Sequence, residues 1–272
     1  MKKTLLIAAA ALISVSAFAA DVVSSANVVG YSQVELAPGF TMIRTPFADG
    51  TNALSIQSIL TTNGLTAGPS AGSADQILFW DQSVPQYDLY FLHDGTGGKT
   101  PPVHLTGKWV DNATGLIASN SVAPGTGFFF TKAGATTVTN IFSGDVVVAA
   151  TGTNSIELLE GFNMVSYPFS SEFELNTTIT NWIDQGAKAG SDEGAADKIT
   201  FWDPVGSKYD TYFLHDGTAG KLLVPEKLGK WIDASTDLVA SNSIPLNSAF
   251  FYQRQSGEGT ITIEVEQPYN LD

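Results

Sequence analysis

The sequence of 272 residues contains no cysteine. Disulfide bonds, cysteine-ligated zinc, iron–sulfur clusters and thiol catalysis are therefore excluded. Charged residues are also scarce, at 15% of positions, and the 13 Lys and Arg are outnumbered by 27 Asp and Glu. The formal net charge of -14 argues against nucleic-acid binding, because phosphate backbones are bound by clustered basic side chains and no basic cluster follows Lys3.

Aromatic residues, by contrast, are plentiful, with 16 Phe, 8 Tyr and 5 Trp. Hydrophobic residues make up 43% of the chain. Disordered chains combine low hydrophobicity with high net charge, so this composition indicates a folded protein with an aromatic core.

Residues 1–20 are typical of a bacterial secretory signal peptide. Lys2 and Lys3 precede the apolar run at residues 5–13, and small residues follow at 16–20. The apolar run is too short to span a bilayer, so we expect cleavage near Ala19 or Ala20. The mature chain is then expected to be exported to the periplasm, the cell surface or the medium, with no membrane span.

The chain contains an internal duplication with an offset of 122 positions. The sequence DQILFWD at residues 75–81 recurs as DKITFWD at residues 197–203. Likewise, YDLYFLHDGT at residues 87–96 recurs as YDTYFLHDGT at residues 209–218. The same offset aligns the rest of the two copies without an insertion, which predicts tandem homologous modules at residues 21–148 and 149–272.

Each copy has mostly the period of two that is typical of strands. Short alternating runs occur at residues 34–36, 41–43, 76–80, 87–92, 108–110, 127–131 and 136–142, with Gly, Pro and Asp turns between them. This pattern predicts an all-β fold of two β-sandwich or barrel-like modules. We expect at most one short helix in each copy, at residues 53–60 after Asn52 and at residues 177–183 after Asn176.

An extended apolar segment precedes each copy, at residues 26–31 and 145–149. If such a segment completes the sheet of the preceding module, the N-terminal segment is a free strand that permits head-to-tail assembly. Val28, Val29 and Tyr31 are the candidate residues of this assembly strand. The alternative, which we favour, is that the segment pairs within its own module.

His93 with Asp94, and their repeats His215 with Asp216, are the best catalytic candidates, since a carboxylate can orient a histidine base. Adjacent residues of a strand point to opposite faces, however, which places each Asp badly for its own His. No nucleophile-elbow pattern occurs. We therefore assign these residues to a strand-to-turn role and predict no catalytic set.

Calcium is the only metal with candidate ligands in the sequence. Asp111 and, in the second copy, Asp233 and Asp237 place oxygen ligands at alternating positions near turns. No complete EF-hand loop is present, so solvated acidic turns are the favoured interpretation and no cofactor is expected.

The repeated aromatic residues suggest a sugar-stacking platform. Trp80, Tyr87, Tyr90 and Trp109 recur as Trp202, Tyr209, Tyr212 and Trp231, and together with His93 and His215 they form the candidate ligand-binding set. Large aromatic residues in strands also build β-cores, and core packing is the favoured alternative.

Three motifs carry a resemblance to a known group of proteins. They are NVVGY at residues 27–31, PGF at residues 38–40 and PGTGFF at residues 124–129. With the signal peptide, they resemble uncharacterised secreted proteins common in bacteria of the verrucomicrobial lineage. In the second copy Leu246-Asn247 replaces the Pro-Gly turn. The resemblance implies export and an all-β fold, and it implies no catalytic residues.

These features favour an exported structural or cell-surface protein, with itself or other surface proteins as partners, and leave self-assembly through strand exchange at the module ends as an open alternative. The alternative is an extracellular module with two glycan sites, in which duplication adds avidity. A secreted hydrolase is the third possibility.

Overall fold

The computed structural model describes residues 28–49, 53–97, 102–203, 206 and 208–270, and the expected signal peptide lies outside this range. The all-β fold is confirmed, because the regular elements of the described residues are strands and three single turns of 3₁₀ helix. The first copy contains β1 (Val29–Leu36), β2 (Gly39–Arg44), β3 (Phe47–Ala48), β4 (Leu54–Ser55), β5 (Gln76–Asp81), β6 (Gln86–His93), β7 (Lys108–Asp111), β8 (Ser121–Val122), β9 (Gly127–Lys132) and β10 (Val138–Val146). The second contains β11 (Thr153–Leu158), β12 (Gly161–Val165), β13 (Phe173–Glu174), β14 (Lys198–Asp203), β15 (Lys208–Leu214), β16 (Thr218–Ala219), β17 (Leu222–Leu223), β18 (Trp231–Asp233), β19 (Ser243–Ile244), β20 (Phe250–Arg254) and β21 (Ile261–Glu266). The 3₁₀ turns are η1 (Ala71–Ser73), η2 (Val103–Leu105) and η3 (Pro225–Lys227).

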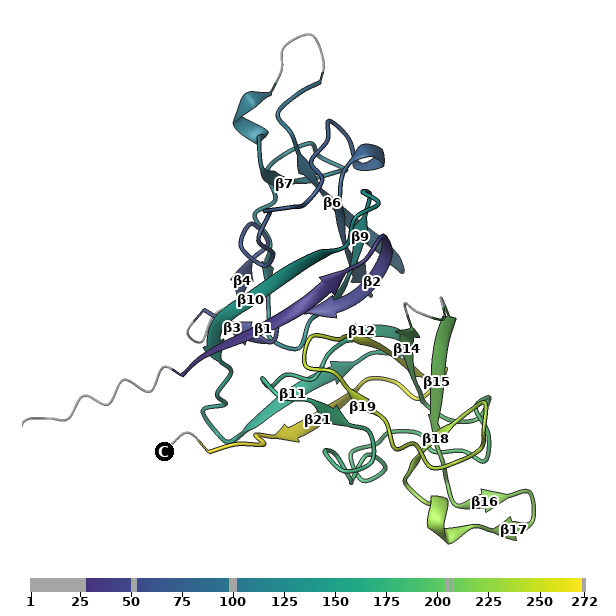
Figure 1. Ribbon diagram of the computed structural model, residues 1–272. Helices are drawn as coiled ribbons and strands as arrows, with labels where there is room; N and C mark the ends of the chain where they lie inside the picture. The colour runs from purple at the N-terminus through teal and green to yellow at the C-terminus, as the bar shows by residue number, and fades with distance from the viewer. Residues whose placement is uncertain (1–27, 50–52, 98–101, 204–205, 207, 271–272) are drawn as a thin grey trace, which may run out of the picture.

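Each copy contributes one five-stranded antiparallel sheet. The strand orders are β2-β9-β5-β6-β7 and β12-β20-β14-β15-β18, and they correspond strand for strand. Figure 1 shows the two copies one above the other, each with its own group of strands. The equal strand order agrees with the duplication, and the module boundaries stay a prediction from the sequence.

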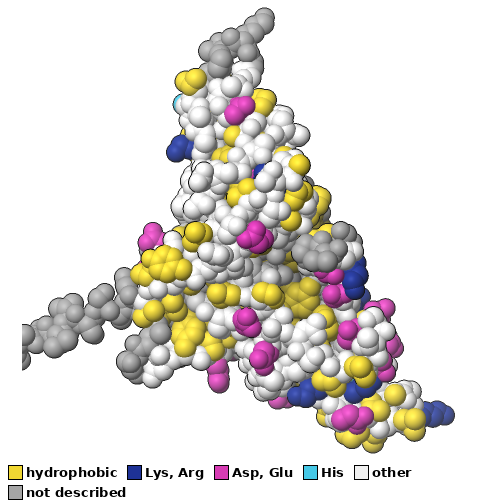
Figure 2. All heavy atoms as spheres, viewed as in Figure 1, with side chains coloured by type: hydrophobic (Ala, Val, Ile, Leu, Met, Phe, Trp, Pro, Cys, Tyr) yellow, Lys and Arg dark blue, Asp and Glu magenta, His cyan; other side chains and the backbone are white. Residues whose placement is uncertain are grey.

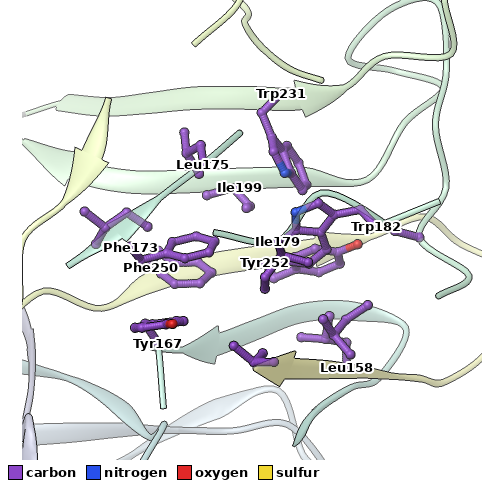
Figure 3. Packing of buried hydrophobic residues seen from close by; sticks show 14 of the residues in the cluster. Leu158, Tyr167, Phe173, Leu175, Ile179, Trp182, Ile199, Trp231, Phe250 and Tyr252 are labelled. Carbon is purple, nitrogen blue, oxygen red and sulfur yellow. The ribbon is translucent and has the colours of Figure 1, made fainter. Parts of the chain in front are cut away.

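A second, smaller layer faces each five-stranded sheet. It is the sheet β1-β10-β3 in the first copy and the pair β11-β21 in the second. The two main buried clusters lie between these layers, one in each copy. Figure 3 shows the cluster of the second copy, where Tyr167, Phe173 and Phe250 stack close to Trp182, Trp231 and Tyr252.

The two expected helices are absent, and side-chain amides explain why. The carbonyl oxygen of Asn176 accepts a hydrogen bond from the backbone N–H of Trp231 at 2.7 Å, and its amide donates to the carbonyls of Trp231 and Ala240. Gln57 makes the same three bonds to Trp109 and Ala118. These bonds hold each segment as a turn beside the sheet, and the Thr and Ser residues around them are poor helix formers.

Gln57 and Asn176 also reveal a local shift between the copies. They fill equivalent places although only 119 positions separate them, and β4 and β13 pair with their partners in this same shifted register. The expectation that the copies align without an insertion is therefore wrong over this segment. In the segment that carries Trp182, the second copy is three residues longer than the first, and Trp182 packs into the core.

The candidate assembly strand is paired within its own copy. From Val29 to Leu36, β1 lies antiparallel to β10, with Val29 opposite Asp145 and Tyr31 opposite Ser143. This is the arrangement that the sequence favoured over a free strand. Val28, Val29 and Tyr31 nevertheless keep exposed side chains, and Tyr31 is 75% exposed. Asp145 and Val146 also pair with β3, so the segment at residues 145–149 begins as the end of β10.

Gly30, in the NVVGY motif, is required by close packing. A β-carbon at this position would overlap the ring of the buried Phe47, which lies over Gly30. We expect Gly30→Ala to lower the free energy of unfolding by about 1–3 kcal/mol, as is usual for overpacking. Urea denaturation followed by far-UV circular dichroism measures this change.

The matched control is Gly72→Ala, because a β-carbon there meets no atom within 4 Å. This variant should stay within about 0.5 kcal/mol of the parent. Equal effects of the two substitutions would show that packing against Phe47 does not explain Gly30.

Candidate functional site

The two copies meet through reciprocal contacts. Trp80 Nε1 of the first copy donates to the carbonyl of Phe162 at 2.8 Å, and Trp202 Nε1 of the second donates to the carbonyl of Phe40 at 2.9 Å. The two donors, Trp80 and Trp202, are repeats of each other, and so are the two acceptors, Phe40 and Phe162. Such reciprocity is the mark of an isologous interface, in which the same surface patch is used on both sides.

The backbone between the copies shows the same symmetry. The N–H of Arg44 donates to the carbonyl of Asn247, and the N–H of Ser166 donates to the carbonyl of Gly125. Isolated bridges join Ile43 to Ser248 and Thr126 to Val165. In both cases the second contact joins the repeats of the two residues that form the first. The contacts therefore define a local twofold axis between the copies.

Side-chain contacts of two residues, Arg44 and Asn247, break this symmetry. The buried guanidinium of Arg44 donates to the carbonyls of Tyr167 and Phe169 at 2.6 and 2.9 Å, whereas its repeat is Ser166. Burial lowers the pKa of Arg44 to about 9. On the other side, Asn247 bonds to Ser32 and to the carbonyl of Gln33 in β1. The replacement of the Pro-Gly turn in the second copy therefore provides a side chain that holds β1.

Aromatic rings line the surface at the twofold axis. The rings of Trp80 and Tyr87 lie 5.1 Å apart, and those of Trp202 and Tyr209 lie 5.0 Å apart at nearly the same angle. Below them a buried cluster of both copies joins the sheets. We call this surface the dyad groove and define it by Phe40, Trp80, Tyr87, Phe129, Phe162, Trp202, Tyr209 and Phe251.

The dyad groove consists of two adjoining cavities of about 480 and 190 Å³. Tyr87 and Tyr209 line both of them, so the cavities meet at these two side chains. Tyr87 is 40% exposed and Tyr209 47%, which leaves much of each ring open to a ligand. The larger cavity falls in the size range usual for small-molecule sites.

The groove carries little charge. In the larger cavity Lys198 and Glu193 are the charged lining residues, and they have opposite signs. Burial raises the pKa of both Tyr87 and Tyr209, and the nearby Tyr209 raises that of Tyr87 further. The tyrosine hydroxyls therefore stay protonated near neutral pH and are available as hydrogen-bond donors.

The structure divides the aromatic candidates into two groups. Trp109 and Trp231 are fully buried. Tyr90 and Tyr212 are also buried, and their hydroxyls accept hydrogen bonds from Asn120 and Asn242. These four residues belong to the cores. Trp80 and Trp202 are half-buried and lie at the dyad groove.

His93 is the buried last residue of β6, and His215 is buried directly after the end of β15. Nδ1 of each ring accepts the backbone N–H of the glycine two residues later, at 2.8 Å for Gly95 and 2.9 Å for Gly217. The rings also lie against Phe91 and Phe213. This geometry fits the strand-to-turn role, and neither histidine is among the lining residues of the dyad groove.

The three calcium candidates are occupied by turn contacts. Asp111 Oδ1 accepts the N–H of Ala113, and Asp233 Oδ1 accepts the N–H and hydroxyl of Ser235. Asp237 forms an ion pair with Lys227 at 2.7 Å. Among the described residues no group of three or more His, Asp or Glu is placed to hold one metal ion.

Two features of the structure, one at the groove and one in the interior of each copy, were not singled out from the sequence. Phe40 and Phe162, both about half exposed, form the rim of the dyad groove. Each copy also contains a fully buried carboxylate with a basic partner, Asp75 with Lys132 and Asp197 with Arg254. The second feature has a sequence signal, because the acid and the base recur with the same offset.

The comparisons with known protein families, curated proteins and solved structures found no match to this chain. In the described part of the chain, no helix has the length and apolar character that a membrane crossing requires.

Proposed function

We propose that the protein is an exported glycan-binding protein and that the dyad groove is its binding site. The observation that carries the proposal is the set of open aromatic rings at the twofold axis, in two Trp–Tyr pairs. A pyranose ring has apolar faces, which stack on aromatic rings, and hydroxyls at its edge. Lys198, Thr200, Thr211 and Gln253 line the larger cavity and supply hydrogen-bonding groups for such hydroxyls.

The site also favours binding over catalysis. Among the described residues no histidine lines the groove, and its charged residues Glu193 and Lys198 are not accompanied there by a second carboxylate. A glycosidase uses two carboxyl groups across the scissile bond, which supports a binding role over a hydrolase.

Substitution of the shared tyrosines tests this proposal. We expect a panel of neutral oligosaccharides, built from glucose, xylose, mannose or N-acetylglucosamine, to include one that binds and changes the tryptophan fluorescence. Tyr87→Ala and Tyr209→Ala should each weaken that binding about 30-fold, because central aromatic residues contribute about 2 kcal/mol or more to binding sites. Isothermal titration calorimetry measures the change.

The matched control is Tyr31→Ala, which removes an exposed tyrosine from β1 outside the groove. Its affinity should equal that of the parent protein. If no oligosaccharide of the panel binds, or if the three variants bind equally well, the groove is not a glycan site.

A structural role at the cell surface, with self-assembly, is the second candidate. The outer face of β1 and β10 exposes Val29, Tyr31 and Ile141. In Figure 2 apolar side chains gather on the side where β1 lies, while acidic side chains are spread over the visible face. Light scattering and electron microscopy of the exported protein test this candidate, since ordered polymers would support it and a monodisperse single chain would contradict it.

A further inference from the structure

The aromatic rings of the dyad groove follow the twofold symmetry, but the other side chains that line it do not. Thr200 and Thr211 face the larger cavity, and their repeats in the first copy are Leu78 and Leu89. Leu78 lines the smaller cavity. At Thr200 one half of the groove therefore has a hydroxyl where the other half has the aliphatic side chain of Leu78, and Thr211 adds a second hydroxyl to the larger cavity.

The other polar lining residues also differ between the two cavities. Lys198 and Gln253 line the larger cavity, whereas their repeats Gln76 and Thr131 are not part of the smaller one. Glu193 belongs to the larger cavity too, and its repeat is Ala71. Among the described lining residues, the charged side chains and the Thr and Gln side chains of the groove thus all come from the second copy.

The two halves also cannot act as independent sites. Tyr87 and Tyr209 line both cavities, so a ligand stacked on these rings in one cavity occupies surface that the other needs. Two identical ligands related by the twofold axis would compete for the same two rings. A single ligand that crosses the axis uses both tyrosines without conflict.

We infer that the groove holds one neutral oligosaccharide per chain, laid across the local twofold axis in a single orientation, with its hydroxyl-rich end over Thr200 and Thr211. This inference rests on the proposed function and replaces two equivalent sites with one. Neutrality follows from the opposite charges of Lys198 and Glu193 and from the net charge of -14, which disfavours an acidic glycan. The apolar half over Leu78 and Phe129 receives a sugar face with few hydroxyls to satisfy.

Exchange of residues between the two halves tests the inference. The probe is the neutral oligosaccharide that binds best in the panel, titrated into the full chain by isothermal titration calorimetry. We expect a stoichiometry of one. Thr200→Leu, which installs the residue of the first copy, should weaken binding about 10-fold, the value of one lost hydrogen bond to a buried polar group. Leu89→Thr, the reverse exchange at the repeat of Thr211, lies outside the lining of both cavities and should change the affinity less than twofold.

A second variant keeps the test decisive if Thr200→Leu disturbs the sheet. Thr211→Leu removes the neighbouring hydroxyl from β15 and should also weaken binding about 10-fold, with an unchanged circular dichroism spectrum. A stoichiometry of two, or binding by Thr200→Leu and Thr211→Leu as tight as that of the parent protein, would overturn the inference while the proposed function stands. Tighter binding of an oligogalacturonide than of any neutral probe would overturn the assignment to neutral glycans. Absence of binding by every oligosaccharide would overturn both.

Discussion

Asp197→Asn is expected to lower the free energy of unfolding by about 3–5 kcal/mol, because it leaves a buried cation without its counter-charge. Asp197 is fully buried and lies 3.0 Å from the guanidinium of Arg254. It also accepts the hydroxyl of Tyr252 at 2.7 Å and the backbone N–H groups of Lys188 and Gln255, both at 2.8 Å. Asparagine keeps the shape of the side chain, so the decrease in the free energy of unfolding reports the contribution of the charge and of the hydrogen bonds.

Urea denaturation, followed by both tryptophan fluorescence and far-UV circular dichroism, measures this loss. The exposed Asp88 supplies a control, since Asp88→Asn should stay within about 0.5 kcal/mol of the parent. Asp75→Asn makes the equivalent change in the first copy, where Lys132 lies 3.1 Å away, and should also be strongly destabilising. A loss below about 1 kcal/mol for both buried positions would show that these carboxylates do not stabilise their copies.

Trp231→Ala is also expected to have a large effect. The cavity that it creates should lower the free energy of unfolding by about 3–5 kcal/mol. The Trp231 ring is fully buried in the core of the second copy, as Figure 3 shows. It lies 5.2 Å from Trp182, edge to face, and 6.1 Å from Tyr252. Such aromatic pairs add about 0.5–1.5 kcal/mol each beyond the area that they bury.

Trp109→Ala is the matched variant in the first copy. Trp109 is equally buried, but its core has Phe130 where the second copy has Tyr252, and the second core also contains Trp182, which lies on the segment that is three residues longer in that copy. We therefore expect the loss from Trp231→Ala to exceed that from Trp109→Ala by about 1 kcal/mol. Thermal or urea unfolding of the two variants measures the difference, and a larger loss from Trp109→Ala would contradict this account of the second core.

The strands could be predicted from the sequence because their signals are local. Period-two runs and Gly or Pro turns place β2, β5, β6 and β9 close to their observed bounds. The helices could not be predicted correctly, since the amide of Asn176 bonds to Trp231, which lies 55 positions away. Propensity within a window contains no information about such a contact.

The site was only partly predictable for a different reason. Repetition marks core and interface residues alike, so Trp80 and Trp109 are indistinguishable in the sequence although one lies at the groove and the other in a core. The alternation along β5 and β6 predicts which side chains share a face of the sheet. Which face becomes part of the site depends on the packing of one copy on the other. The buried pair of Asp75 and Lys132 was within reach, because both positions keep their charge in the second copy.

The reciprocal interface has a genetic consequence. In a dimer of identical chains, every substitution appears on both sides of the axis at once, so a site on that axis must be lined by the same residues twice. Here the two sides are encoded separately, and Thr200 stands opposite Leu78 without constraint from it. A directed library can therefore vary one half of the groove while the other half and the interface remain unchanged, an experiment that no homodimer permits.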